Sequence, residues 1–190
     1  MNIKRRELPK MFALLLVFAA VPFALVGCVD IPTLINYISL TVGIILTVAT
    51  PFLPPGASVI AGLVKAGLAD LSATITEYNA DTNPADKATL LAKIDTILTD
   101  AIANFQQLIA TILPGAGAFV TLIENLAEDV LSAIAGIRSQ FANPPAVITA
   151  LEIKATKKSI TPRKYKKPTD YRDVVNRHLV AAGRPELALH

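Results

Sequence analysis

The chain has 190 residues, of which 53% are hydrophobic and 17% charged, enough for one helical core but few for two. Its formal charge of +3 hides an asymmetry: residues 1–28 carry four bases and one acid, 29–150 four bases and ten acids, and 151–190 ten bases and four acids. An acidic middle without Trp argues against a nucleic-acid-binding core, so no nucleic-acid partner is expected.

The first 27 residues are predicted to be a signal peptide. Four basic side chains lie in the first ten residues, before an uncharged apolar run from Met11 to Val26, and Gly27 and Cys28 come next. A basic region, an apolar region and a small residue in this order are typical of a secretory signal. The run is interrupted by Pro22 and is shorter than the roughly 20 residues of a spanning helix.

Cys28, the only cysteine, ends a four-residue motif, Leu25-Val26-Gly27-Cys28. Here the chain resembles bacterial lipoproteins, which implies cleavage before Cys28, diacylglycerol on its sulfur and acylation of the new amino group. Two or more acyl chains hold a protein firmly on a membrane. An uncleaved signal anchor and a buried free cysteine remain alternatives. Because Val29 follows Cys28, where inner-membrane retention would favour Asp, the outer membrane of the cell envelope is favoured.

The segment from Ile31 to Val64 contains no charged residue and has two interpretations. We expect a buried helix over residues 33–50, because the apolar stretch is cut at Pro51 after about 16 residues, fewer than a membrane span needs. The alternative is a membrane-inserted or membrane-lying hairpin over residues 31–64. The next helix has apolar residues at helical spacing.

A long helix is predicted from Pro84 to Leu113, capped by Asn83, with Asp86 in its first turn. Its apolar residues alternate at steps of three and four, which places them on one stripe. They are Leu91, Ile94, Leu98, Ala101, Phe105, Leu108 and Ile112. We therefore expect this stripe to face the core.

A further helix is predicted from about Gly117 to Phe141, after a break at Leu113-Pro114-Gly115-Ala116. Its inward positions are Phe119, Ile123, Leu126, Val130, Ile134, Ile137 and Phe141. Glu124, Glu128 and Asp129 are expected on a solvated face rather than as paired catalytic carboxylates.

Three short motifs recur at spacings of 59 to 60 residues, which indicates an internal repeat. They are Leu53-Pro54-Pro55-Gly56-Ala57 with the later proline-glycine break, Leu71-Ser72-Ala73 with Leu131-Ser132-Ala133, and Asn83-Pro84 with Asn143-Pro144. We predict two αα-hairpins, 31–82 and 84–143, that form an antiparallel four-helix bundle over residues 28–143. Chance matches among common residues are the alternative. The fold class is all-α.

Beyond Pro144 the composition becomes basic, and residues 144–168 are predicted to be an extended linker. A short helix and tail are expected over 169–190, with Thr169 as cap. Seven bases could contact anionic lipid, lipopolysaccharide, wall polymer or an acidic protein, unless the segment is only a solvated tail. They are Lys154, Lys157, Lys158, Arg163, Lys164, Lys166 and Lys167.

Catalytic patterns are weak in this sequence, and no enzyme activity, cofactor or metal site is expected. The two histidines, His178 and His190, lie in the tail, and we expect neither to join a triad or metal site in the bundle. The glycine turns lack the Gly-Lys-Ser/Thr of a phosphate loop. The sequence therefore predicts a lipid-anchored structural or interaction module of the envelope, and the alternative is a holin-like or pore-forming protein with residues 31–64 inserted.

Overall fold

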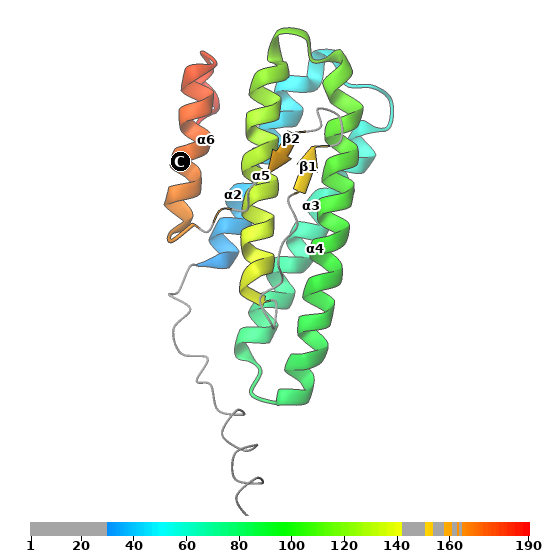
Figure 1. Ribbon diagram of the computed structural model, residues 1–190, viewed down its shortest axis with the longest axis vertical. Helices are drawn as coiled ribbons and strands as arrows, with labels where there is room; N and C mark the ends of the chain where they lie inside the picture. Colours follow the sequence, from blue (N-terminus) through cyan, green and yellow to red (C-terminus); the bar gives the residue numbers. More distant parts are fainter. Residues whose placement is uncertain (1–29, 142–150, 154–157, 161–162, 164) are drawn as a thin grey trace, which may run out of the picture.

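The structure is a computed structural model, and it describes residues 30–141, 151–153, 158–160, 163 and 165–190. Five α-helices account for most of these residues, so the all-α class is confirmed (Figure 1). They are α2 (Ile31–Ala49), α3 (Ala57–Ala80), α4 (Pro84–Ile112), α5 (Val120–Phe141) and α6 (Pro168–Ala181). Short 3₁₀ turns lie at Thr50–Phe52, Leu113–Gly115, Gly117–Phe119 and Pro185–Leu187.

Two three-residue strands, β1 (Leu151–Ile153) and β2 (Lys158–Ile160), pair antiparallel and contact α5. They lie within the segment predicted to be an extended linker. No alternating pattern in this segment is long enough to predict them.

Local capping residues explain where the helices begin. The Asn83 side chain accepts a hydrogen bond of 3.0 Å from the Ala85 amide, and Pro84 occupies the first turn of α4, as predicted. Asp30 caps α2 in the same way. The predicted cap of α6 is wrong: Lys167 precedes the helix, and its amide donates a 3.0 Å hydrogen bond to the Asp170 carboxylate.

Both predicted proline-glycine breaks separate helices. Gly56, with φ of 90°, lies at the start of α3, a left-handed conformation that glycine adopts without a Cβ clash. After Leu113–Gly115, a second 3₁₀ turn continues to Phe119, with Gly117 at φ of 51°. The helix α5 therefore begins at Val120 instead of Gly117.

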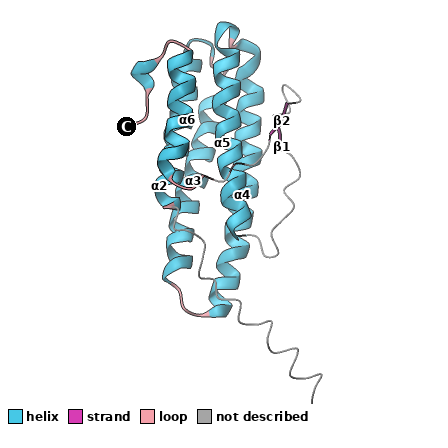
Figure 2. Ribbon diagram, turned by 60° about the vertical axis from the view of Figure 1, so that its left-hand side comes forward, coloured by secondary structure: helices cyan, strands magenta, loops and turns pink. Residues whose placement is uncertain are grey.

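The helices lie side by side with α5 at the centre of the contacts (Figures 1 and 2). The most extensive contact joins α3 and α4, while α2 packs on α3 and α5, and α4 also packs on α5. The last helix, α6, returns along the molecule and packs against both α2 and α5. The C-terminal segment is thus part of the folded body.

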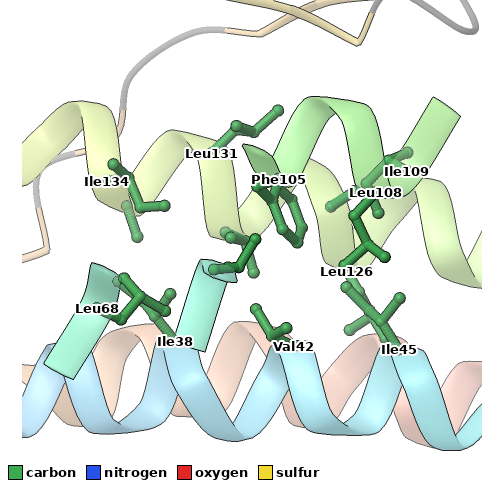
Figure 3. Packing of buried hydrophobic residues seen from close by; sticks show 14 of the residues in the cluster. Ile38, Val42, Ile45, Leu68, Phe105, Leu108, Ile109, Leu126, Leu131 and Ile134 are labelled. Carbon is green, nitrogen blue, oxygen red and sulfur yellow. The ribbon is translucent and has the colours of Figure 1, made fainter. Parts of the chain in front are cut away.

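The core consists mainly of aliphatic side chains, with Phe105 and Tyr171 fully buried among them; Figure 3 shows the part around Phe105. Six of the seven stripe residues predicted for α4 are buried, and Leu91 is the exception, because its neighbour Leu90 is buried instead. Figure 3 shows Ile38 and Ile45 of α2 pointing toward residues of the other helices. The interior is therefore packed from α2 through α5.

Two segments, Ile31–Phe52 and Ala57–Ala80, are long and apolar enough to cross a membrane by length and composition alone. Buried core helices and signal sequences meet the same criterion. Ten residues of α2 are buried within the folded body, among them Ile38, Val42 and Ile45. The preference for a buried helix over residues 33–50 is compatible with this packing.

Candidate functional site at the buried carboxylate of Asp129

The middle of α5 is buried on all sides, including the face predicted to be solvated. Every residue from Val130 to Ile137 is buried, because α2 and α4 cover one side of α5 and the C-terminal segment covers the other. Asp129 lies in this covered region, and its side chain is only 1% exposed. The expectation of a solvated Asp129 is therefore wrong, whereas Glu124 and Glu128 are half-buried.

An imidazole and a guanidinium of the C-terminal segment reach the Asp129 carboxylate. Oδ2 lies 2.8 Å from Nδ1 of His178, and Oδ1 lies 3.3 Å from a terminal guanidinium nitrogen of Arg163. The Arg163 contact has the geometry of a hydrogen bond. The His178 contact is close but its ring N–H is not aligned with the oxygen, so it is an electrostatic contact that becomes an ion pair when the ring is protonated.

Arg163 also connects to α5 at two further points. Its other terminal nitrogen lies 3.7 Å from a carboxylate oxygen of Glu128, and its backbone amide donates a 3.3 Å hydrogen bond to the Ser132 carbonyl. The residues Glu128, Asp129, Arg163 and His178 form what we call the Asp129 cluster. It holds the polypeptide just before α6, and α6 itself, against α5.

Burial raises the pKa of the Asp129 carboxyl above its ordinary value of 3.8, because a desolvated carboxylate is disfavoured. The charges of His178 and Arg163 act in the opposite direction, and Glu128 adds to the rise. Desolvation is the largest of these effects. The two cations therefore offset only part of the cost of placing this charge inside the protein.

Two tyrosines form the apolar side of the same contact. The rings of Tyr165 and Tyr171 meet edge to face with centroids 5.4 Å apart, a favoured aromatic geometry. Burial raises the pKa of Tyr165 to about 12 and that of Tyr171 well above its ordinary value of 10.0. The phenol of Tyr171 lies by the Thr41 hydroxyl of α2, which itself donates to the Tyr37 carbonyl. Both phenols thus stay neutral inside the fold.

The end of the chain returns to α6 through Asn176. Its amide nitrogen donates a 3.0 Å hydrogen bond to the Leu189 carbonyl, and its amide oxygen accepts one of 2.7 Å from the Leu189 amide. Leu189 is itself buried. The last residues are therefore held by a specific pair of hydrogen bonds.

The predicted site residues have different outcomes. Leu25, Val26, Gly27 and Cys28 lie outside the described residues, as do Lys154, Lys157 and Lys164. Lys158 lies in β2, and Lys166 and Lys167 are exposed just before α6. Arg163, one of the seven predicted polyanion-binding bases, is engaged by Asp129 and Glu128.

Sequence reasoning assigned His178 to a separate tail and so missed its contact with the bundle. One signal could have revealed it: Tyr171, Val175 and Leu179 recur at steps of four, and all three are buried. A helix with such a stripe needs an apolar surface to pack on. Because Leu179 is packed against the bundle, its neighbour His178 is also brought close to the bundle surface.

The Asp129 cluster joins Arg163 and His178 to α5 by charge pairing and so stabilises the packing of the C-terminal segment. Among the residues that the structure describes, no group of three or more His, Cys, Asp or Glu could hold a metal ion. Comparisons with protein-family models, with curated proteins and with solved structures find no match.

Proposed function

We propose that the protein is a lipid-anchored structural or interaction module of the bacterial cell envelope. The observation that carries the proposal is the motif Leu25-Val26-Gly27-Cys28, followed after only two residues by the first turn of α2 at Ile31. Lipid on Cys28 would place the folded helices directly on the membrane. The outer membrane is favoured, because the residue after Cys28 is Val29 and not the Asp that favours inner-membrane retention.

The helical body supports a binding role more than a catalytic one. Its interior is filled by aliphatic side chains, and its most buried charge, Asp129, is paired with Arg163 and His178. We also propose that α2 to α5 are the antiparallel four-helix bundle of two related hairpins that the sequence repeat predicts. Such a unit presents outer faces of fixed shape to other envelope components.

The basic segment before α6 is the proposed contact for a polyanion. Lys166 and Lys167 are exposed, and Lys154, Lys157, Lys158 and Lys164 are close to them in sequence. Lysines near a surface of anionic lipid each contribute about 1 kcal/mol of attraction. Arg163 is better assigned to the Asp129 cluster, so we propose that six lysines form the contact surface. Anionic lipid, lipopolysaccharide, wall polymer and an acidic protein remain the candidate partners.

The anchor is tested by replacing Cys28 with Ala in the full-length protein expressed in bacteria. We expect the variant to accumulate as a larger precursor and to incorporate no radiolabelled palmitate, while the wild type is processed and labelled. Palmitate in the Cys28→Ala protein would overturn the lipid assignment. A Thr96→Ala variant, changed at an exposed position of α4 far from Cys28 in sequence, serves as the control and should be processed normally.

A second candidate function is a membrane-active protein whose residues 31–64 insert. The observation that favours it is the length and apolar composition of α2 and α3. Against it, α3 carries Lys65, Asp70 and Glu77, and α2 buries Ile38 and Ile45 in the protein core. Carbonate washing of membranes that contain the protein without its signal, residues 29–190, distinguishes the two: a module is released, whereas an inserted hairpin stays.

A further inference from the structure

Exposed apolar side chains gather on the outer face of α2 and α3. Among the residues that the structure describes, the exposed large hydrophobic side chains are Leu40 on α2, Val59 and Leu63 on α3, and Val180 on α6. Val59 is 66% exposed and Leu63 54%, values that a core-facing position would not show. Three of these four side chains therefore belong to one pair of packed helices.

A shallow groove of about 430 Å³ runs between α2 and α3 on this side. Small residues line much of it, among them Gly43 and Thr47 of α2 and Ala61 and Gly62 of α3. We call the groove, together with Leu40, Val59 and Leu63, the apolar flank. Leu40 precedes Gly43 by three residues, Val59 precedes Gly62 by three, and Leu63 follows Val59 by four. Residues three or four apart are neighbours on a helix surface, so these side chains border the groove.

The apolar flank carries a single charged side chain, Lys65, in its part of α2 and α3. No charged residue occurs from Ile31 to Val64. The Lys65 ammonium lies over the groove, 3.7 Å from the position that a Cβ on Gly43 would occupy. A long aliphatic stem with its charge at the tip can stay in contact with headgroups while the stem lies on apolar surface.

The lipid attachment point limits where a bilayer can lie. Cys28 is three residues before Ile31, the first residue of α2, and three fully extended residues span roughly 11 Å. A lipidated Cys28 would therefore keep the start of α2 close to the headgroups. The bilayer must then face either the end of the helices or the side of α2.

The end of the molecule is unsuited to this contact. Figure 1 shows the turn between α3 and α4 extending past the start of α2, so a bilayer at this end would meet that turn first. The turn is polar and acidic, with Asp81 and Asp86 exposed or half-exposed. Anionic headgroups would repel these carboxylates. The bilayer must therefore face the side of α2. The apolar part of that side is the apolar flank, which α2 shares with α3.

We propose that the apolar flank lies on the bilayer to which Cys28 is tethered, with Leu40, Val59 and Leu63 among the acyl chains nearest the headgroups and Lys65 at the phosphates. The inference rests on the proposed lipid anchor, and it adds the surface that the anchor brings into contact. The protein then lies along the membrane on its α2–α3 side.

The test uses the full-length protein, because lipid on Cys28 leaves its sulfur unable to react with maleimide. Leu40→Cys and Leu63→Cys are each labelled with an environment-sensitive fluorophore, and Ala103→Cys, exposed on α4, is the matched control. The purified lipoproteins are reconstituted in vesicles with nitroxide lipids, whose nitroxide lies either near the headgroup or near the chain end. The unsubstituted protein, carried through the same labelling, measures how much Cys28 is free.

We expect several-fold stronger quenching at positions 40 and 63 than at position 103, and stronger quenching by the shallow nitroxide than by the deep one. Equal, weak quenching at all three positions in a lipidated protein would overturn the proposed membrane contact of the apolar flank, while the lipid anchor on Cys28 would stand. Stronger quenching by the deep nitroxide would overturn it in favour of insertion. If Cys28 itself is labelled while positions 40 and 63 are still quenched, the lipid anchor is overturned but the membrane contact of the apolar flank is not. Unchanged helical circular dichroism verifies that each variant is folded.

Discussion

Nδ1 of His178 lies 2.8 Å from Oδ2 of Asp129, so the last long helix of the chain meets a carboxylate buried in the middle of α5. The contact ties together parts of the sequence that have opposite net charge. Arg163 approaches the other oxygen of the same carboxylate. The acidic body and basic end of the chain therefore complement each other within one folded molecule. The carboxylate is buried there, whereas the Arg163 and His178 side chains remain partly exposed to water.

The two partners in the Arg163–Asp129 pair should respond differently to substitution. Arg163→Ala leaves a carboxylate that is 1% exposed with His178 as its remaining cation, and we expect it to lower the free energy of unfolding by about 1–3 kcal/mol. The half-exposed guanidinium is screened by water, which favours the lower part of that range. Asp129→Asn removes the buried charge and lets both cations face solvent, so its effect should be within about 1 kcal/mol.

Urea unfolding of the protein beginning at Val29 measures both effects. Arg172→Ala is the matched control, because Arg172 pairs with the well-exposed Asp173 and should contribute at most about 0.5 kcal/mol. The double variant Asp129→Asn, Arg163→Ala should be about as stable as Asp129→Asn alone, since the two residues share one interaction. Additive losses would show that Arg163 acts elsewhere.

The raised pKa of Asp129 predicts a defined pH dependence. The unfolded chain ionises this carboxyl near pH 3.8, whereas the folded protein ionises it only at higher pH. Between the two values the folded state binds more protons, so the stabilisation that Asp129 contributes is complete below pH 3.8 and is lost as the pH rises through the folded pKa.

We therefore expect the stability of the wild type, relative to Asp129→Asn, to fall as the pH rises from acidic to neutral. The difference between the two proteins isolates Asp129 from the other carboxylates. The groups that act electrostatically on the Asp129 carboxyl are His178, Arg163 and Glu128, and Asp129 in turn acts on Tyr165 and Tyr171. Urea unfolding at a series of pH values measures the difference, and a wild type that gains on the variant with rising pH would contradict a raised pKa.

The stripe of α4 predicts where a charge cannot be tolerated. Leu98 and Phe105 are both fully buried, so Leu98→Asp or Phe105→Asp places an unpaired carboxylate in an apolar core. Such a charge costs several kcal/mol against a total stability of roughly 5–15 kcal/mol, and we expect the helices to unfold. Ala103→Asp, exposed on the same helix, should melt like the wild type. Unchanged thermal melts of the two core variants would exclude this stripe from the core.

The basic segment predicts salt-dependent binding to anionic surfaces. The protein beginning at Val29 should bind anionic vesicles or lipopolysaccharide at low salt and release them at high salt, because the Debye length falls from about 10 Å at 0.1 M to about 3 Å at 1 M. Alanine at the lysines of the segment should abolish this binding. These lysines are Lys154, Lys157, Lys158, Lys164, Lys166 and Lys167.

Arg163 is retained in that variant, because its loss would release the Asp129 cluster and confuse a binding effect with a folding effect. Lys87→Ala combined with Lys93→Ala, on α4, is the control for removing charge from another surface. Equal binding to neutral and anionic vesicles, or binding that survives the six substitutions, would refute the polyanion contact and favour the membrane-active alternative.

Sequence patterns predicted the elements whose causes are local. Asn83-Pro84 begins α4, the proline-glycine motifs separate helices, and the spacing of Ile94, Leu98 and Phe105 identifies the buried stripe. A cap needs only the next few residues, and a stripe needs only the helical period. The alternating order of breaks and stripes was therefore enough to predict an all-helical protein.

The tertiary structure decided what surrounds each polar residue. Asp129 lies beside Glu128 in a pattern that is typical of a solvated face, and nothing near it in sequence indicates burial. It is buried because α6 and the residues before it fold back onto α5 and bring Arg163 and His178 to its carboxylate. Without those partners a buried charge would be too costly, so the packing of the C-terminal segment and the burial of Asp129 depend on each other.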